Sequence, residues 1–327
     1  LAWLVAALLL PARRALLAAS AVAAAVLLAG VVALAGGEAA QRAAVLPALA
    51  RVSLGSGFWL ALLCLWAAAA DALRQLGLGR WPHAAAHALL WLLPALLLAG
   101  GALDALSLLK EYANRQDVFV GALGRHLHIV GAALVPALLI GVPMGWLATR
   151  SERLASPLFA TLGIVQTLPS IALFGLLMAP LAWLGQVWPA SGLQGIGLAP
   201  ALVALTLYAL LPIVHGVAAG LQQVPAALLE AATAMGMSRG QRLRQVTLPL
   251  ALPVLMSALR LTAVQLIGLA VVAALIGAGG LGSLVFQGLL GSAHDLVLLG
   301  VLPVVALALG VDALLRLLTP APLVPQR

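Results

Sequence analysis

Two charged residues lie within long apolar stretches of the C-terminal half, Arg260 and Asp312. A charge in hydrocarbon is costly, so residues of this kind are functional candidates. If both stretches are helices entering the membrane from one side, Arg260 lies roughly 15 Å and Asp312 roughly 9 Å from that side, at 1.5 Å per residue. Neighbouring helices would then allow an ion pair. The alternative is that both side chains extend separately to the lipid headgroups.

Groups that bind metals or act as nucleophiles are scattered along the sequence. His215 has no second histidine or carboxylate at ligand spacing, and His126 and His128 would point to different sides of a helix. The single cysteine, Cys64, excludes an intrachain disulfide and a multi-cysteine metal site. We therefore expect no metal site and no catalytic residues, so the protein is not expected to be an enzyme.

Gly277, Gly279 and Gly282 form the G-x-G-x-x-G pattern of dinucleotide-binding proteins. That site requires a preceding β-strand, whereas here the pattern follows a long apolar stretch. We reject the nucleotide interpretation. Close helix packing or a flexible gate on the outer side of the membrane is the expected role, because glycines let backbones approach closely in lipid.

The composition is that of a membrane protein. Hydrophobic residues make up 64% and charged residues 8% of the chain, against roughly 25% charged in soluble domains. The formal charge of +8 comes from arginines in short segments beside apolar runs, where they set topology. Lipid is therefore the expected surrounding, and nucleic acid is not an expected partner.

The apolar runs that match the bilayer thickness predict an all-α, polytopic transmembrane bundle. A spanning helix needs about 20 residues and satisfies its own backbone. The apolar residues 1–10 are too few, and they suggest the tail of a truncated span or a signal-like stub. Full spans are expected at 15–36, 57–73, 84–103, 127–148, 156–178, 198–219, 251–275 and 295–318.

The loop charges give the orientation. With the first loop inside, alternating spans place eleven arginines in the cytoplasm and five basic residues outside, which obeys the positive-inside rule. The cytoplasmic set is Arg13, Arg14, Arg74, Arg80, Arg150, Arg153, Arg239, Arg242, Arg244, Arg316 and Arg327; the outer set is Arg42, Arg51, Lys110, Arg115 and Arg125.

The most polar stretch between two spans is EAATAMGMSRGQRLRQVTLP, Glu230 to Pro249. It begins in a helix-forming block that breaks at Gly236, since glycine enters the left-handed region without steric cost. A short basic helix is expected next, ending at Pro249, which suits the first turn of the following span. The arginines of this basic helix are Arg239, Arg242 and Arg244.

This stretch resembles the EAA loop of ABC-importer permeases, the cytoplasmic element that docks into the ATPase subunit. The resemblance rests on Glu230, Ala231, Ala232, Gly236, Val246, Leu248 and Pro249, which keep the family spacing without a gap. It implies that ATP is used by a separate cytoplasmic ATPase and that this chain binds no cofactor. The alternative for the same residues is an interfacial amphipathic helix held by its arginines.

The stretch Ile164 to Leu177 contains Pro169 within an apolar run. Proline removes a backbone donor and clashes with the carbonyl four residues back. Broken helices at membrane depth tend to line cavities, so a pathway-lining role is one hypothesis and a plain packed kink the other. The candidate pathway residues are Gln166, Thr167, Pro169, Ser170 and Tyr208.

Three further stretches resemble permeases of osmoprotectant ABC importers, namely QTLPSIALFGLL, TLYALLPIVHGV and AALIGAGGLGSLVFQGLL. SLGSGFWLA and LKEYANRQDVF resemble the Yeh-type members, which carry extra N-terminal spans. The resemblance implies N-terminal spans at 1–104, an extracytoplasmic linker at 105–125, a type I permease core at 126–320 with the EAA loop at 225–250, and a cytoplasmic tail at 321–327.

The expected function is therefore that of a permease subunit in the bacterial inner membrane, importing glycine betaine or a related osmoprotectant. The implied partners are a cytoplasmic ABC ATPase, an extracytoplasmic substrate-binding protein and a second permease, identical or related. An importer for another small solute of the amino-acid type is the first alternative. A secondary transporter or channel is the second, although coupling to protons or sodium usually needs deep carboxylates.

Overall fold

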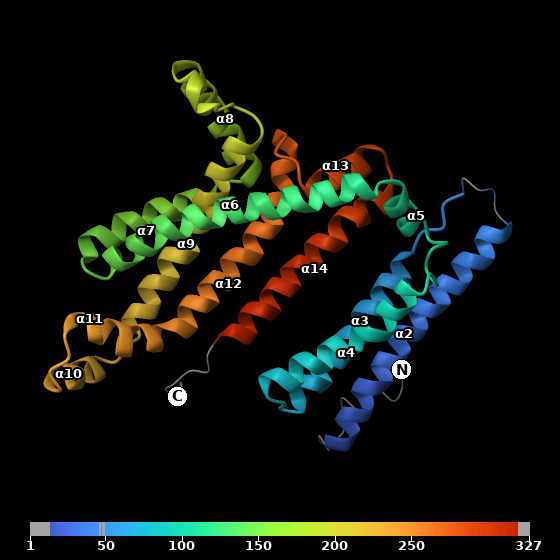
Figure 1. Ribbon diagram of the computed structural model, residues 1–327, viewed down its shortest axis with the longest axis horizontal. Coiled ribbons are helices and arrows are strands. Elements are labelled where there is room, and N and C mark those ends of the chain that lie inside the picture. Colours follow the sequence, from blue (N-terminus) through green and yellow to red (C-terminus); the bar gives the residue numbers. More distant parts are fainter. Residues whose placement is uncertain (1–13, 46, 48–49, 320–327) are drawn as a thin grey trace. The chain divides into compact units, whose positions relative to one another are not determined.

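The computed structural model describes residues 14–45, 47 and 50–319 (Figure 1). Regular secondary structure in these residues is entirely helical, and 8 helices are long and apolar enough to cross a membrane. This confirms the all-α, polytopic prediction. The predicted stub at 1–10 and tail at 321–327 lie outside the described residues.

The chain divides into two compact units, up to Gln116 and from Asp117 onward. The boundary falls within the predicted linker 105–125. The first unit holds α2 (Arg14–Val45), α3 (Ser56–Gln75), α4 (Arg80–Ala99) and α5 (Ser107–Asn114). Its core is made largely of alanine and leucine from α2, α3 and α4, such as Ala24, Ala69 and Leu90.

The second unit contains the remaining helices, and its first helix, α6, begins at the unit boundary. In order they are α6 (Gln116–Ala148), α7 (Glu152–Thr167), α8 (Ser170–Val187), α9 (Leu198–Gln222), α10 (Ala226–Ala234), α11 (Arg239–Arg242), α12 (Leu248–Val272), α13 (Leu281–Leu290) and α14 (His294–Leu318). Short 3-10 turns lie at Pro189–Ser191 and Ala273–Ile276, and a π-helical turn lies at Leu243–Thr247.

One predicted span is wrong. Residues 156–178 do not form a single helix, because α7 ends at Thr167 and α8 begins at Ser170, leaving in a different direction (Figure 1). Pro169 cannot donate the helical hydrogen bond, and Leu168 takes extended backbone angles. The membrane-length helix in this region is Ser170–Val187. The ten-residue helix α13 was not predicted, since it is too short to register as a span.

Helix α9 is the most buried of the membrane-length helices, and α12 runs beside it (Figure 1). Small residues set their approach: a Cβ added at Gly216 would overlap the Cβ of Ala258. On an adjoining face of α9, Ile213 and Val217 pack against Gly141 and Gly145 of α6. Small residues at these positions allow the close van der Waals packing that holds helices together in lipid.

We predict that Gly216→Ala destabilises the protein by about 1–3 kcal/mol, the usual cost of overpacking. The second substitution Ala258→Gly should restore stability, because it removes the methyl group that the new Cβ meets. Thermal unfolding of the purified protein in detergent measures both effects. Gly268→Ala on α12 is the control, since nothing lies within 4 Å of its added Cβ. Equal melting temperatures for Gly216→Ala and Gly268→Ala would contradict the packing argument.

Candidate functional site

The polar connection between α9 and α12, residues 225–250, is called the EAA segment below. Its first helix, α10, ends in a Schellman motif at Gly236, which has φ +77°. The Gly236 N–H donates to Thr233 O at 2.9 Å and the Met237 N–H to Ala232 O at 3.1 Å. These bonds satisfy the last carbonyls of the helix. Gly236 is therefore the sharp turn that the sequence predicts.

Sequence reasoning missed the cap that follows. Ser238 and Gln241 form a capping box at the start of α11: Gln241 N–H donates to Ser238 Oγ at 3.3 Å, and Ser238 N–H to Gln241 Oε1 at 2.8 Å. The S-x-x-Q pattern that identifies such a box was present. Arg242 Nη1 also donates to Thr233 Oγ1 at 2.5 Å. The two short helices are thus fixed to each other by side-chain bonds.

Pro249 lies in the first turn of α12, as expected, but the basic helix does not end there. A helix continues from Arg239 to Ile276 without interruption. A π-helical turn makes this possible, because Leu248 N–H donates to Leu243 O, five residues back. The wider turn accommodates Pro249, which has no N–H to donate. The EAA segment is therefore joined directly to α12, and Val246 and Leu248 lie within the joining turn or next to it.

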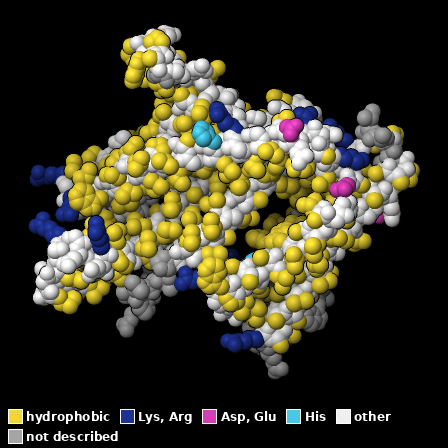
Figure 2. Space-filling view, viewed as in Figure 1, with side chains coloured by type: hydrophobic (Ala, Val, Ile, Leu, Met, Phe, Trp, Pro, Cys, Tyr) yellow, Lys and Arg dark blue, Asp and Glu magenta, His cyan; other side chains and the backbone are white. Residues whose placement is uncertain are grey.

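The face that α10 presents to solvent contains Glu230 and Ala231, whereas Ala232 is 1% exposed and anchors the helix. Leu228 and Met235 are also exposed. Arginine side chains gather at the same end of the second unit, over the α6–α7 turn and α11 (Figure 2). The EAA segment is thus a mixed apolar and charged knob at one end of the unit.

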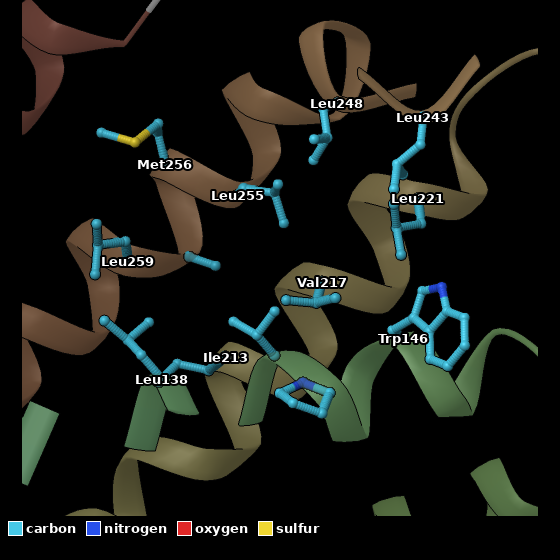
Figure 3. Close-up of a pocket in the computed structure, with 13 residues that line it drawn as sticks. Leu138, Trp146, Ile213, Val217, Leu221, Leu243, Leu248, Leu255, Met256 and Leu259 are labelled. Atoms are coloured by element: carbon cyan, nitrogen blue, oxygen red, sulfur yellow. The ribbon is translucent and has the colours of Figure 1, made fainter. Parts of the chain in front are cut away.

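An apolar cavity of about 510 Å³ lies beside the joining turn (Figure 3). Leu243 and Leu248 point into it from the EAA segment, together with residues of α6, α9 and α12 such as Trp146, Val217 and Leu259. Gln223 Nε2, at the end of α9, donates to Leu250 O at 3.1 Å. The turn is therefore pinned to α9 on one side and borders free volume on the other.

The break between α7 and α8 is braced by α9. Tyr208 Oη donates to Leu168 O at 2.6 Å, and Gln166 Nε2 donates to Tyr208 O at 2.5 Å. The first bond satisfies the Leu168 carbonyl, which the break leaves free, and the second satisfies the Tyr208 carbonyl, which lacks a helical donor because residue 212 is proline. Tyr208 is 4% exposed and acts as a buried brace at the break, and its pathway role stays a prediction.

The other candidate pathway residues differ in exposure. Thr167 and Pro169 are exposed and Ser170 is half-buried. Thr167 Oγ1 donates to Ile164 O within its own helix at 2.7 Å. Thr167 and Pro169 therefore lie at the broken corner with free surface, and they stay candidates for lining the path.

The structure brings Arg260 and Asp312 together. Arg260 Nε of α12 lies 3.2 Å from Asp312 Oδ1 of α14, and the side chains are 31% and 27% exposed. Sequence reasoning missed the third member, Arg316, whose Nε lies 2.8 Å from Asp312 Oδ2. The i, i+4 spacing of Asp312 and Arg316 was the available signal. One carboxylate thus compensates two guanidinium groups and links α12 to α14.

We predict an asymmetric loss of stability at this site. Asp312→Ala leaves Arg260 without a counter-charge and should cost about 2 kcal/mol, below the 3–5 of a fully buried pair because both groups are partly exposed. Arg260→Leu should cost less, since Arg316 still compensates Asp312. Adding Arg260→Leu to Asp312→Ala should recover folded protein, measured by thermal unfolding. Independent, additive effects in this double-mutant cycle would rule out the coupling.

The rejected nucleotide pattern is part of a helix junction. Gly282 lies in α13 with a 3-10 turn before it instead of a strand. A Cβ on Gly282 would overlap the carbonyl oxygen of Val271 in α12. Close helix packing is thus what this glycine provides, which is one of the two roles expected for the pattern.

Comparison with known proteins agrees with these features. Residues 137–323 match the family model "Binding-protein-dependent transport system inner membrane component". Residues 1–109 match "ABC transporter permease YehY, N-terminal domain". The chain is 41% identical over 192 residues to the osmoprotectant import permease protein OsmW of Salmonella typhimurium, covering 59% of this chain and 86% of that protein. It is 34% identical to the choline transport system permease protein OpuBD of Bacillus subtilis, covering 64% and 87%.

Solved structures give the same fold. The inward-facing methionine ABC transporter MetNI superposes with a TM-score of 0.53 at 27% identity, covering 63% of this chain and 99% of the matched chain. An amino acid ABC transporter crystallised with histidines, at 17% identity and a TM-score of 0.53, shares the fold. The chain belongs to the family of inner-membrane components of binding-protein-dependent transport systems, and it is a multi-pass permease subunit of an ABC importer with the type I fold.

Proposed function

We propose that this permease imports glycine betaine or a chemically related osmoprotectant, and that a separate cytoplasmic ATPase docks on α10 and hydrolyses the ATP. The observation that carries the coupling role is the exposed α10, which its Schellman turn and the Arg242–Thr233 bond tie to the helix that continues through α11 into α12. A rigid knob on a spanning helix converts movement of a docked partner into movement of that helix. The substrate class is supported by the relatives, which are permeases for osmoprotectants and choline.

The other partners follow from the same family. An extracytoplasmic binding protein delivers and selects the solute, and a second permease, either another copy or a related chain, completes the path. An amino acid is the alternative cargo, since MetNI is a methionine transporter at 27% identity. A proton- or sodium-coupled carrier is disfavoured, because Asp312 is held between two arginines instead of being available for coupling.

Uptake of labelled glycine betaine tests the proposal. Proteoliposomes that contain this chain, its ATPase and its binding protein should accumulate glycine betaine only when ATP is present on the ATPase side. Unlabelled choline and carnitine are tested as competitors, with methionine as the amino-acid comparison. ATP-driven uptake of methionine without betaine uptake would keep the importer role and replace the substrate class.

Gly236→Val should abolish transport while the protein is still made and inserted. The left-handed φ of +77° at Gly236 is a genuine outlier for a β-branched residue, so α10 would lose its angle. The cause is backbone strain, because nothing lies within 4 Å of an added Cβ. Gly240→Val is the matched control in α11, where φ is ordinary and space is equally open. Normal uptake by Gly236→Val would refute a coupling role for this turn.

A further inference from the structure

Two adjacent residues of α6 hold the end of α12 that lies away from the EAA segment. Arg125 Nε donates to Ala278 O at 3.0 Å, and His126 Nε2 lies 3.1 Å from Ile267 O. Ile267 is near the end of α12, and Ala278 is in the loop before α13. These two contacts connect α6 both to the end of α12 and to the loop that follows it.

The His126 ring is fully buried, at 0% exposure. A carbonyl oxygen can only accept, so Nε2 carries a hydrogen, and in the neutral imidazole Nδ1 then presents a lone pair. Nδ1 is buried and has no hydrogen-bond partner among the described residues. A buried acceptor without a partner weakens the closed arrangement relative to one in which water reaches it. The contact between His126 and Ile267 can therefore break when water reaches the ring.

The glycines of the loop fit around these two side chains. Gly279 and Gly280 have φ +83° and +82°. A Cβ on Gly280 would lie 3.2 Å from His126 Nδ1, and one on Gly279 would lie 3.3 Å from Arg125 Cγ. The loop thus needs glycine both for its backbone angles and for the approach of the α6 side chains.

We propose that Arg125 and His126 form a clamp that closes the loop 277–280 against α6 and releases during each transport cycle. The inference rests on the proposed function, because the movement that opens the clamp would start at the ATPase. Helix continues from Arg239 to Ile276, so a tilt imposed at the EAA segment displaces Ile267 and the loop directly. Arg125 and His126 are positioning residues in this scheme and do not contact ATP.

A buried cysteine reports whether the clamp is closed. Ala278 is 1% exposed, and Ala278→Cys is introduced with the exposed Cys64 replaced by serine. Reaction with a membrane-impermeant maleimide should be slow. Adding His126→Ala should raise the labelling rate at least about tenfold by freeing the loop, whereas His126→Gln, whose amide can still donate to Ile267 O, should keep it slow. Leu127→Ala, at an exposed neighbour on α6, is the matched control.

Release during the cycle is measured in the complete complex. Trapping with ATP and vanadate should raise labelling of the cysteine introduced at position 278, in a variant that still transports. A second reporter, Ala204→Cys, is at a fully buried position of α9 and should stay unlabelled, which separates clamp opening from unfolding.

Two results would overturn the clamp: unchanged labelling on adding His126→Ala, or equal labelling in resting and trapped complexes that transport normally. The first measurement needs no ATPase. If betaine and methionine uptake both fail while His126→Ala still exposes the cysteine at position 278, the proposed function falls and the closing contact stands. If uptake succeeds and labelling never changes, the clamp alone is wrong.

Discussion

The close approach of α9 and α12 at Gly216 and Ala258 is the contact on which the second unit depends. In lipid, helices gain little from burying apolar surface against each other, because the surrounding tails are equally apolar. Association then relies on van der Waals contact, which requires small residues where two backbones meet. Gly216 and Gly220 supply that surface on α9. Because α9 and α12 bracket the EAA segment, this contact also sets the spacing of the segment's two ends.

Polar side chains in the second unit are used mainly where the helical backbone is interrupted or ends. Tyr208 bonds the carbonyl at the α7–α8 break, and Arg125 bonds a carbonyl in the loop before α13. A carbonyl without a partner in hydrocarbon costs several kcal/mol, so each departure from helix needs such a donor. The charged exception, Asp312, is held by two arginines and links α12 to α14.

These contacts give α12 a distinct role among the helices. At one end it continues from the EAA segment, along its length it packs on α9, and near its other end His126 contacts Ile267. Because helix continues from Arg239 to Ile276, a tilt at one end is carried along its length. The apolar cavity beside Leu243 and Leu248 leaves volume next to the turn that moves in the proposed transport cycle. Helix α12 thus combines a continuous backbone with free volume next to the turn from which it starts.

The sequence by itself determined the membrane class, the helical fold and the family. The thickness of the hydrocarbon layer sets the length of a spanning apolar run. The backbone effects of glycine and proline are local and do not depend on tertiary contacts, which is why the turn at Gly236 and the disruption at Pro169 were predicted. Only the tertiary structure decided which partner each polar group found. Tyr208 donates to the carbonyl of Leu168, Asp312 pairs with a second arginine, and His126 contacts Ile267, which is 141 residues further along the chain. Those outcomes depend on helix rotation and crossing, and apolar runs in lipid encode both weakly because almost every face is hydrophobic.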